Sequence, residues 1–409
     1  MYTRIENSKF ENSKWLMLLL FALAHSNESF YAPSLHIIAK SLSSSNNLSM
    51  MSSVFSYLGF STGMLFFGRA SDLFGRKLVL KYGILSYCIS TFLFVFVNDL
   101  NSFLVLRFLQ SFSISSCSCV TQAIIRDSYT GDRLSSVYAF ISSGIAFIPS
   151  TLSGFSLVIS ENFGWKYNML VAEAFALIGF FFVTNKLTET NKFVDEKQEI
   201  SYSKVFFTML KDKKVLLYTV IMICGNGIFF GFLIEMPFLL VNTLKLSERS
   251  YGVLLIAFAL MLFFAGRINI YLIKKISILK IMSLGYLILI FSQFLMLIAD
   301  YLFSHSNGNF IYAILFSRIL YMYSHSFIIP HVMRLGLDGY QKVNGTSGSI
   351  FGFMYYFGLA ISNFVISIIH IDGEISHFCY YNFFLALTSL ACFLLVKKAY
   401  RVSKDINFK

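Results

Sequence analysis

Long apolar segments, separated by short stretches rich in charged and turn residues, run the length of the chain. They fall near residues 15–38, 50–69, 78–97, 101–124, 134–159, 167–186, 215–241, 250–272, 277–300, 309–331, 345–370 and 377–397. A helix needs roughly 20 apolar residues to cross a bilayer. The pattern therefore predicts an all-α membrane protein with twelve transmembrane helices.

The composition agrees with a membrane protein. Of 409 residues, 56% are hydrophobic and only 13% are charged, about half the charged share of a soluble domain. The net charge of +12 does not indicate nucleic acid, because the basic residues are not clustered on a soluble module. The six cysteines lie in apolar stretches, and Cys117 and Cys119 have no further His or Cys at ligand spacing. We therefore expect free thiols and no metal.

The basic residues instead predict the orientation in the membrane. With the N-terminus in the cytoplasm, 27 of the 33 Lys and Arg residues fall on the cytoplasmic side. The opposite loops hold only four, which are Lys40, Lys166, Lys245 and Arg249. Cytoplasmic loops of membrane proteins carry such an excess. Both termini are therefore predicted to be cytoplasmic.

One long polar connection, at 186–214, divides the spans into six and six. We expect an N-terminal bundle at 1–190, a cytoplasmic linker at 191–214 and a C-terminal bundle at 215–409. A solvated linker is favoured over a short surface helix at 201–210, whose apolar face is only about two turns long. The halves also repeat weakly, since the segments around Arg107 and Arg318 are alike.

The connection between the second and third spans reads GRASDLFGRKLVL at 68–80. It resembles the loop G-x-L-A-D-R-x-G-R-K-x-x-L of the major facilitator superfamily through Gly68, Asp72, Gly75, Arg76, Lys77 and Leu80. Leu73 stands where the family has its first Arg. The resemblance implies a secondary transporter whose two pseudo-symmetric six-helix bundles alternate in access. It also implies that Asp72 and Arg126 take part in cytoplasmic contacts that latch the bundles together.

Further stretches resemble the bicyclomycin/chloramphenicol-resistance branch of drug:proton antiporters. LRFLQSF and TQAIIRDSY match that branch through residues that include Arg107, Gln110, Arg126 and Asp127. IPSTLSGF matches its fifth-span motif through Pro149, Leu152 and Gly154, whereas Ser153 departs from it. The resemblance implies proton-coupled drug efflux across a bacterial inner membrane.

Ionisable residues inside spans are costly and usually functional. Glu28 lies in the outer half of the first span, with His25 and Tyr31 three residues to either side on one predicted helical stripe. Arg107 is expected to pair with Glu28 or Glu173. Burial favours the protonated form of a carboxylic acid and a nearby Arg favours the ionised form, so Glu28 is our candidate for proton coupling.

Other candidates are less defined. Glu235, just before Pro237, faces either a cavity or the outer mouth, and it has no basic neighbour in sequence. Arg318 is the counterpart of Arg107. Tyr57, Tyr138, Tyr355, Tyr356 and Phe357 are candidates to line a cavity for an apolar substrate, although packing in the core or against lipid is favoured for any single one of them.

The chain has no Walker loop and no nucleophile–base pair, so we expect neither an enzyme nor a cofactor. The expected partners are a small-molecule substrate, protons and the lipid bilayer, and we expect a monomer. The favoured function is proton-coupled export of small apolar or amphipathic compounds. The alternatives are a proton-coupled nutrient importer, an exporter dedicated to one metabolite such as a siderophore, and a non-transporting membrane sensor.

Overall fold

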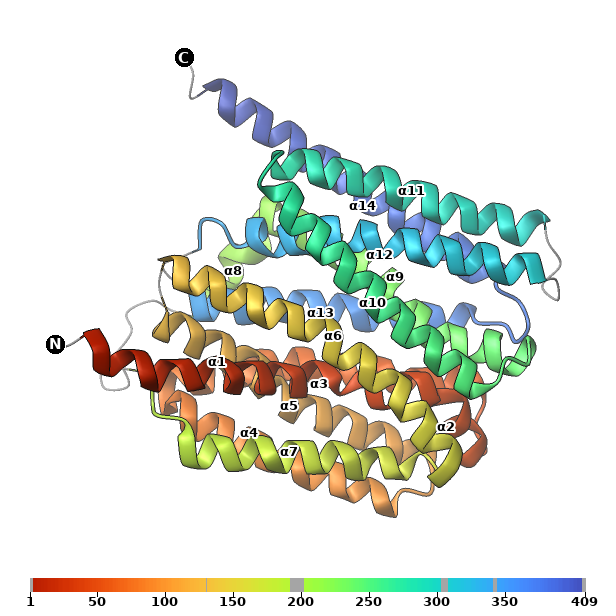
Figure 1. Cartoon of the computed structure of the whole chain (residues 1–409), viewed down its shortest axis with the longest axis horizontal. Coiled ribbons are helices and arrows are strands. Elements are labelled where there is room, and N and C mark those ends of the chain that lie inside the picture. Colours follow the sequence, from red (N-terminus) through yellow and green to blue (C-terminus); the bar gives the residue numbers. More distant parts are fainter. Residues whose placement is uncertain (1–2, 130, 192–201, 303–307, 341–343, 407–409) are drawn as a thin grey trace.

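The computed structural model describes residues 3–129, 131–191, 202–302, 308–340 and 344–406, together with most of their side chains. Twelve long helices of this part of the chain form two bundles of six (Figure 1). The N-terminal bundle consists of α1 (Thr3–Ser26), α3 (Asn46–Phe74), α4 (Arg76–Leu93), α5 (Leu100–Ser128), α6 (Gly131–Phe163) and α7 (Lys166–Lys186). The C-terminal bundle consists of α9 (Lys213–Met236), α10 (Glu248–Ile273), α11 (Ile278–Leu302), α12 (Gly308–Gly336), α13 (Asn344–Ile369) and α14 (Ser376–Ile406).

The lengths and the apolar surfaces of the helices suit a membrane. Nine of those described are long and apolar enough to cross one, and α1, α6 and α12 complete the twelve. Their outward faces carry large apolar side chains, such as Leu287 and Phe384, which are 71% and 62% exposed. Water would disfavour such a surface, whereas lipid does not. The predicted fold class and the predicted spans are confirmed.

The first helix of each bundle is interrupted near a proline. After Ser26, α1 is followed by two 3₁₀ turns, η1 (Glu28–Phe30) and η2 (Ala32–Ser34), and then by the short helix α2 (Leu35–Ser41). Similarly, α9 ends before Pro237 and is followed by the π-helix η4 (Pro237–Thr243). Proline lacks the N–H that a regular helix needs. Irregular backbone at membrane depth is tolerated where protein or a water-filled cavity surrounds it.

Two helix pairs make the most extensive contacts between the bundles, namely α3 with α13 and α6 with α10. The backbones approach closely: a Cβ atom added to Gly154 would lie 3.0 Å from the carbonyl oxygen of Gly252. Polar contacts between the bundles lie near the start of α3 and near α2. Asn46 donates to Asp372 at 2.5 Å, and His36 lies 3.2 Å from Glu248. The bundles therefore touch along their length.

The connection between the bundles contains a helix, which corrects the preference for a plain linker. Helix α8 (Tyr202–Lys211) packs on α9 and α13 and buries Val205 and Met209. Two buried side chains are enough because α8 lies on an existing apolar surface rather than standing alone. Most of the remaining linker, 192–201, lies outside the described residues.

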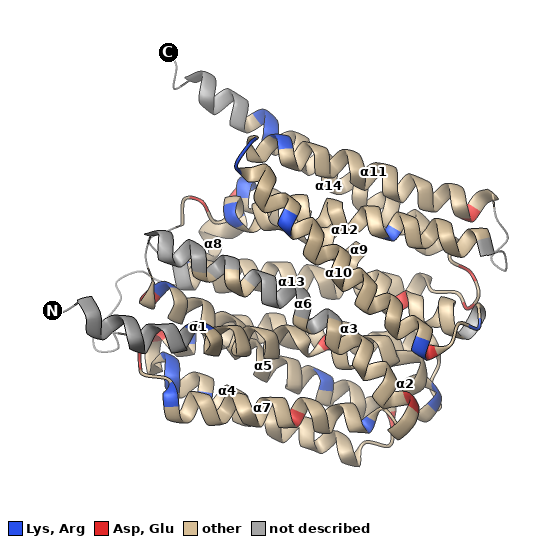
Figure 2. Cartoon of the chain, viewed as in Figure 1, with Lys and Arg blue, Asp and Glu red and all other residues tan. Residues whose placement is uncertain are grey.

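The start of α1, helix α8 and the end of α14 all lie at one end of the bundles (Figure 1). Many of the described Lys and Arg residues gather at this end, and few lie in the middle of the helices (Figure 2). The remaining short element, η3 (Phe94–Phe96), lies at the far end of α4.

This arrangement leads to a prediction on topology. A reporter fused after Lys204 should behave as cytoplasmic, and one inserted near Asn307 as external, because the positive charge is retained on the cytoplasmic side. Alkaline phosphatase and a fluorescent protein, each placed at both sites, measure this. The opposite pattern at either site would contradict the charge argument.

Candidate functional site

A buried ion pair joins the interrupted first helix to α5. Arg107 donates from Nη2 to Oε1 of Glu28, with the Arg107 side chain fully buried and that of Glu28 13% exposed. The irregular backbone after Ser26 places Glu28 beside α3 and α5. The predicted pairing of Arg107 is therefore present, with Glu28 as its partner rather than Glu173.

Polar groups from α3, from α5 and from the segment between η1 and η2 surround this ion pair. Arg107 also donates to Ser52 and to Gln110, each at 3.1 Å, and its guanidinium lies 3.6 Å from the ring centre of Tyr31. The Tyr31 hydroxyl donates to Gln110 at 2.8 Å. Hydroxyl groups satisfy both carboxylate oxygens of Glu28; they come from Ser53 and Ser56. We call Glu28, Tyr31, Arg107 and Gln110 the N-terminal polar site.

His25 does not belong to this site, which corrects the predicted stripe. Its Nδ1 lies 2.9 Å from the carbonyl oxygen of Phe21, one turn back in α1. Spacing of three residues aligns side chains only along a continuous helix, and α1 ends at Ser26. Tyr31 belongs to the site because its ring lies against the guanidinium of Arg107.

Glu235 has a basic partner, which is distant from it in sequence. Its Oε1 lies 2.8 Å from Nδ1 of His370, and Nε2 of the same imidazole lies 3.1 Å from Asp372. Glu235 is buried, and its Oε2 has no hydrogen-bond partner. Glu235 thus lies close to the contact between Asn46 and Asp372. No local sequence signal indicated His370, since it follows the end of α13.

Arg318 has a different environment from Arg107. It donates to the backbone carbonyl groups of Ile228 and Phe229 in α9 and has no carboxylate partner among the described residues. Glu173 is also separate, since its electrostatic neighbour is Cys88.

Three of the predicted aromatic residues meet between α3 and α13. The ring of Tyr356 lies 6.1 Å from that of Tyr57 and 4.5 Å from that of Tyr355. Phe357 instead is 42% exposed on the outer surface, which fits packing against lipid. The side chain of Tyr138 lies outside the described residues. The interface between the bundles is therefore lined by aromatic side chains close to Glu28, since Tyr57 directly follows Ser56, which donates to Glu28.

The loop at 68–80 is held by a second network. Arg76 donates to Asp72 at 2.5 Å and to Asp127 at 3.3 Å, so it connects α3, α4 and α5. Glu189 accepts from the backbone N–H groups of Arg76 and Lys77 at the start of α4. Burial opposes ionisation of Glu189, but its backbone hydrogen bonds outweigh this and lower its pKa. Sequence reasoning missed Glu189, although an acidic residue suits a helix N-terminus.

Glycines of the loop have specific reasons to be there. Gly75 has a φ of 93°, and a Cβ atom on it would lie 2.7 Å from Glu189. Gly68 faces Ser349 of α13, and the Arg126 guanidinium lies next to Gly348. Contacts toward the other bundle thus come from Gly68 and Arg126, whereas the bonds of Asp72 lie within the N-terminal bundle.

Replacing Asp72 with Asn should reduce turnover by roughly tenfold and leave expression nearly unchanged. The substitution keeps an acceptor for Arg76 but loses the charge that strengthens this bond. The transport rate per mole of purified protein measures this loss of turnover. Asp338→Asn is the control, since Asp338 is exposed and lies 3.8 Å from Lys214, a pair that contributes little. Equal losses of protein and transport would mean that Asp72 acts in folding.

The remaining candidates are placed as follows. All six cysteines are free thiols, as expected, and the described residues contain no group of His, Cys, Asp and Glu that could hold a metal. Gly154 lies where α6 and α10 approach. Pro149 lies within α6, but its side chain is outside the described part.

Comparison with known proteins agrees with this geometry. The family model described as Major Facilitator Superfamily matches residues 17–363. A Rickettsia felis protein named as an uncharacterized transporter is 33% identical over 392 residues, covering 95% of this chain and 96% of its own. A chloramphenicol resistance protein from Pseudomonas aeruginosa is 27% identical over 209 residues, covering 50% and 48%. The solved structure of a D-xylose-proton symporter superposes with a TM-score of 0.76 at 14% identity, covering 94% and 97%.

Proposed function

The chain belongs to the major facilitator superfamily, and we propose that within it the protein is a proton-coupled exporter of small apolar or amphipathic compounds. It carries them by alternating access between bundles at 1–190 and 215–409. We place it as a monomer in a bacterial inner membrane, with both termini in the cytoplasm. The similarity to a chloramphenicol resistance protein supports the export of foreign compounds.

The observation that carries this proposal is the buried pair of Glu28 and Arg107. An ionised pair at this depth costs several kcal/mol to desolvate. A protein that does not transport could replace both residues with apolar ones without losing a function. Protonation of Glu28 would break the pair and leave Arg107 held by Ser52 and Gln110. The site therefore has two charge states, each with partners in place, which is what coupling to protons requires.

The same pair weighs against a membrane sensor that has lost transport. Import of a nutrient uses the same fold, and the likeness to a D-xylose-proton symporter concerns the fold alone. The resemblance to drug:proton antiporters through Arg107, Gln110, Arg126 and Asp127 supports export as the proposed direction of transport.

The test is transport by purified protein in liposomes under an imposed pH gradient, with a panel of apolar and amphipathic compounds. The proposal predicts that substrate moves across the membrane in the direction opposite to the movement of protons. Movement of substrate in the same direction as protons would indicate import, and a lack of flux for every compound would indicate a sensor.

A further inference from the structure

Arg318 is a buried cation without a carboxylate partner in the described part of the chain. Its side chain comes from the middle of α12 and is 3% exposed. Two of its nitrogens donate to the backbone carbonyl groups of Ile228 and Phe229, at 3.3 and 3.0 Å. Among the described residues no Asp or Glu lies within ion-pair distance. Carbonyl dipoles compensate a buried charge only in part.

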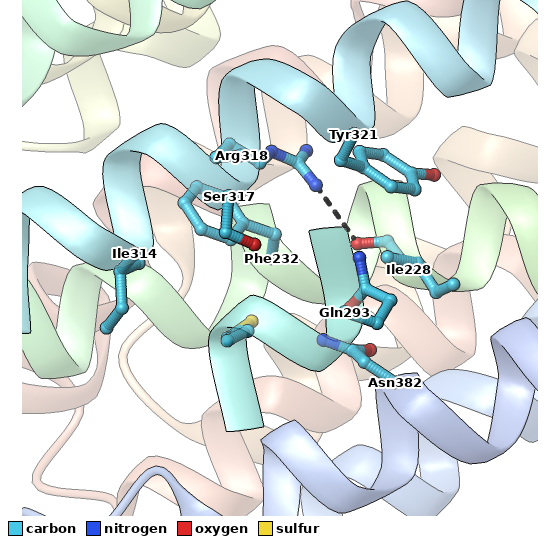
Figure 3. A pocket seen from close by; sticks show the side chains of 9 residues that line it. Ile228, Phe232, Gln293, Ile314, Ser317, Arg318, Tyr321 and Asn382 are labelled. Carbon is cyan, nitrogen blue, oxygen red and sulfur yellow. Dashed lines mark hydrogen bonds between the residues drawn. The ribbon is translucent and has the colours of Figure 1, made fainter. Parts of the chain in front are cut away.

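Unsatisfied polar atoms surround the same guanidinium. Nε of Arg318, Oε1 of Gln293 and Oδ1 of Asn382 have no hydrogen-bond partner, and all three residues are at least nine-tenths buried. Figure 3 shows their head groups around one small cavity, which α9, α11, α12 and α14 enclose. Buried polar groups are rarely left unpaired in proteins without a reason. Their convergence indicates that something polar belongs there.

The two bundles differ in one respect. Arg107 in α5 and Arg318 in α12 occupy similar positions in similar segments. Arg107 receives the carboxylate of Glu28 from the first helix of its bundle. Arg318 receives only backbone carbonyl groups from α9, the first helix of the other bundle. Among the described residues of the C-terminal bundle, the arginine thus has no acid as its partner, and the acid of α9, Glu235, contacts His370 instead.

We propose that Arg318 binds the carboxylate group of the transported compound, so that the substrates include aromatic organic anions. A guanidinium can hold a carboxylate through two parallel hydrogen bonds, and the Nε–H of Arg318, which has no partner among the described residues, is available as a donor. This inference rests on the proposed transport function, since it names a class of compound that is carried.

The surroundings of Arg318 suit an aromatic body next to the carboxylate. Its guanidinium lies 4.1 Å from the ring centre of Phe232 and 4.7 Å from that of Tyr321. Tyr321 also belongs to the apolar cluster that includes Val54 and Tyr57 of the other bundle. The cavity itself has a volume of about 10 Å³, room for about one water molecule. An aromatic substrate is larger than this cavity, so the proposal requires α9 and α12 to move apart on the side that faces the interface between the bundles.

The experiment compares two probes of one shape, naphthalene-2-carboxylate and the neutral naphthalene-2-carboxamide. Their dissociation constants are measured with the purified full-length protein in detergent at neutral pH, by calorimetry in a chloride-free buffer. We expect the carboxylate to bind roughly 10- to 100-fold more tightly than the carboxamide. Arg318→Gln should bind the carboxylate and the carboxamide with about equal affinity.

Arg334→Gln is the matched control, because it removes the same charge from an exposed position of α12 and should keep the preference. If Arg318→Gln does not fold, Arg318→Lys should weaken the preference without changing any charge, because an ammonium group cannot form the two parallel hydrogen bonds. Equal affinities of the two probes for the unmodified protein, or no binding of the carboxylate, would overturn the inference. So would displacement of the carboxylate by chloride at equal concentration, which would indicate a site for inorganic anions.

The assay needs no membrane or gradient, so a failure of proton-driven flux with the preference intact would remove only the proposed coupling.

Discussion

Replacing Glu28 with Gln is expected to abolish pH-driven transport while substrate binding stays measurable. The amide has nearly the shape of the acid and can still accept hydrogen bonds from Arg107, Ser53 and Ser56, which contact Glu28. It cannot take up or release a proton. A transporter locked in one charge state can bind its substrate, but it cannot exchange it against protons. We expect at least a 100-fold loss of flux, equivalent to about 2.7 kcal/mol.

The measurement is flux in liposomes with and without a pH gradient, together with equilibrium binding in detergent. Glu161→Gln is the control, because Glu161 is exposed near the end of α6. Unchanged pH dependence in Glu28→Gln would show that another acid couples protons. Glu235 would then be the first alternative, since its contact with His370 gives it the basic neighbour that a coupling acid needs, and Glu173 the second.

The fold was predictable because membrane helices leave strong signals in sequence. Apolar runs of about 20 residues and the one-sided placement of Lys and Arg depend on the bilayer, not on details of packing. The pairing of Arg107 with an acid was predictable for a similar reason. Most charges in spans pair with a group in their own neighbourhood, and few acids were available to Arg107.

The errors concern places where the backbone departs from a regular helix or where partners are far apart in sequence. His25 was placed beside Glu28 by assuming that the first helix continues, yet α1 ends at Ser26. His370 and Glu235 are 135 positions apart, and only tertiary packing brings them together. Glu189 contacts the start of α4 from beyond α7, which no periodic pattern encodes. These contacts needed coordinates.

Replacing Gly59 with Ala is expected to destabilise the N-terminal bundle and, with it, the N-terminal polar site. A Cβ atom on Gly59 would lie 2.2 Å from the backbone oxygen of Phe108. Backbone cannot move aside as a flexible side chain can, so α3 and α5 would have to separate. Overpacking of this kind costs roughly 1–3 kcal/mol or more. The melting temperature of the purified protein should fall, and Gly266→Ala should leave it unchanged, because the nearest atom there is 3.9 Å away.

The same substitution should reduce transport by more than its loss of folded protein explains. Ser53 and Ser56 of α3 hold Glu28, and Ser52 of the same helix holds Arg107 of α5. Of these bonds, the one between Ser52 and Arg107 joins α3 to α5 and depends on the short distance between the helices that Gly59 permits. A shift of about 1 Å in a positioned group can cost about 100-fold in rate. Flux per folded molecule, compared between Gly59→Ala and Gly266→Ala, separates this effect from stability. Wild-type flux and melting in Gly59→Ala would mean that the spacing of α3 and α5 does not set the geometry of Glu28 and Arg107.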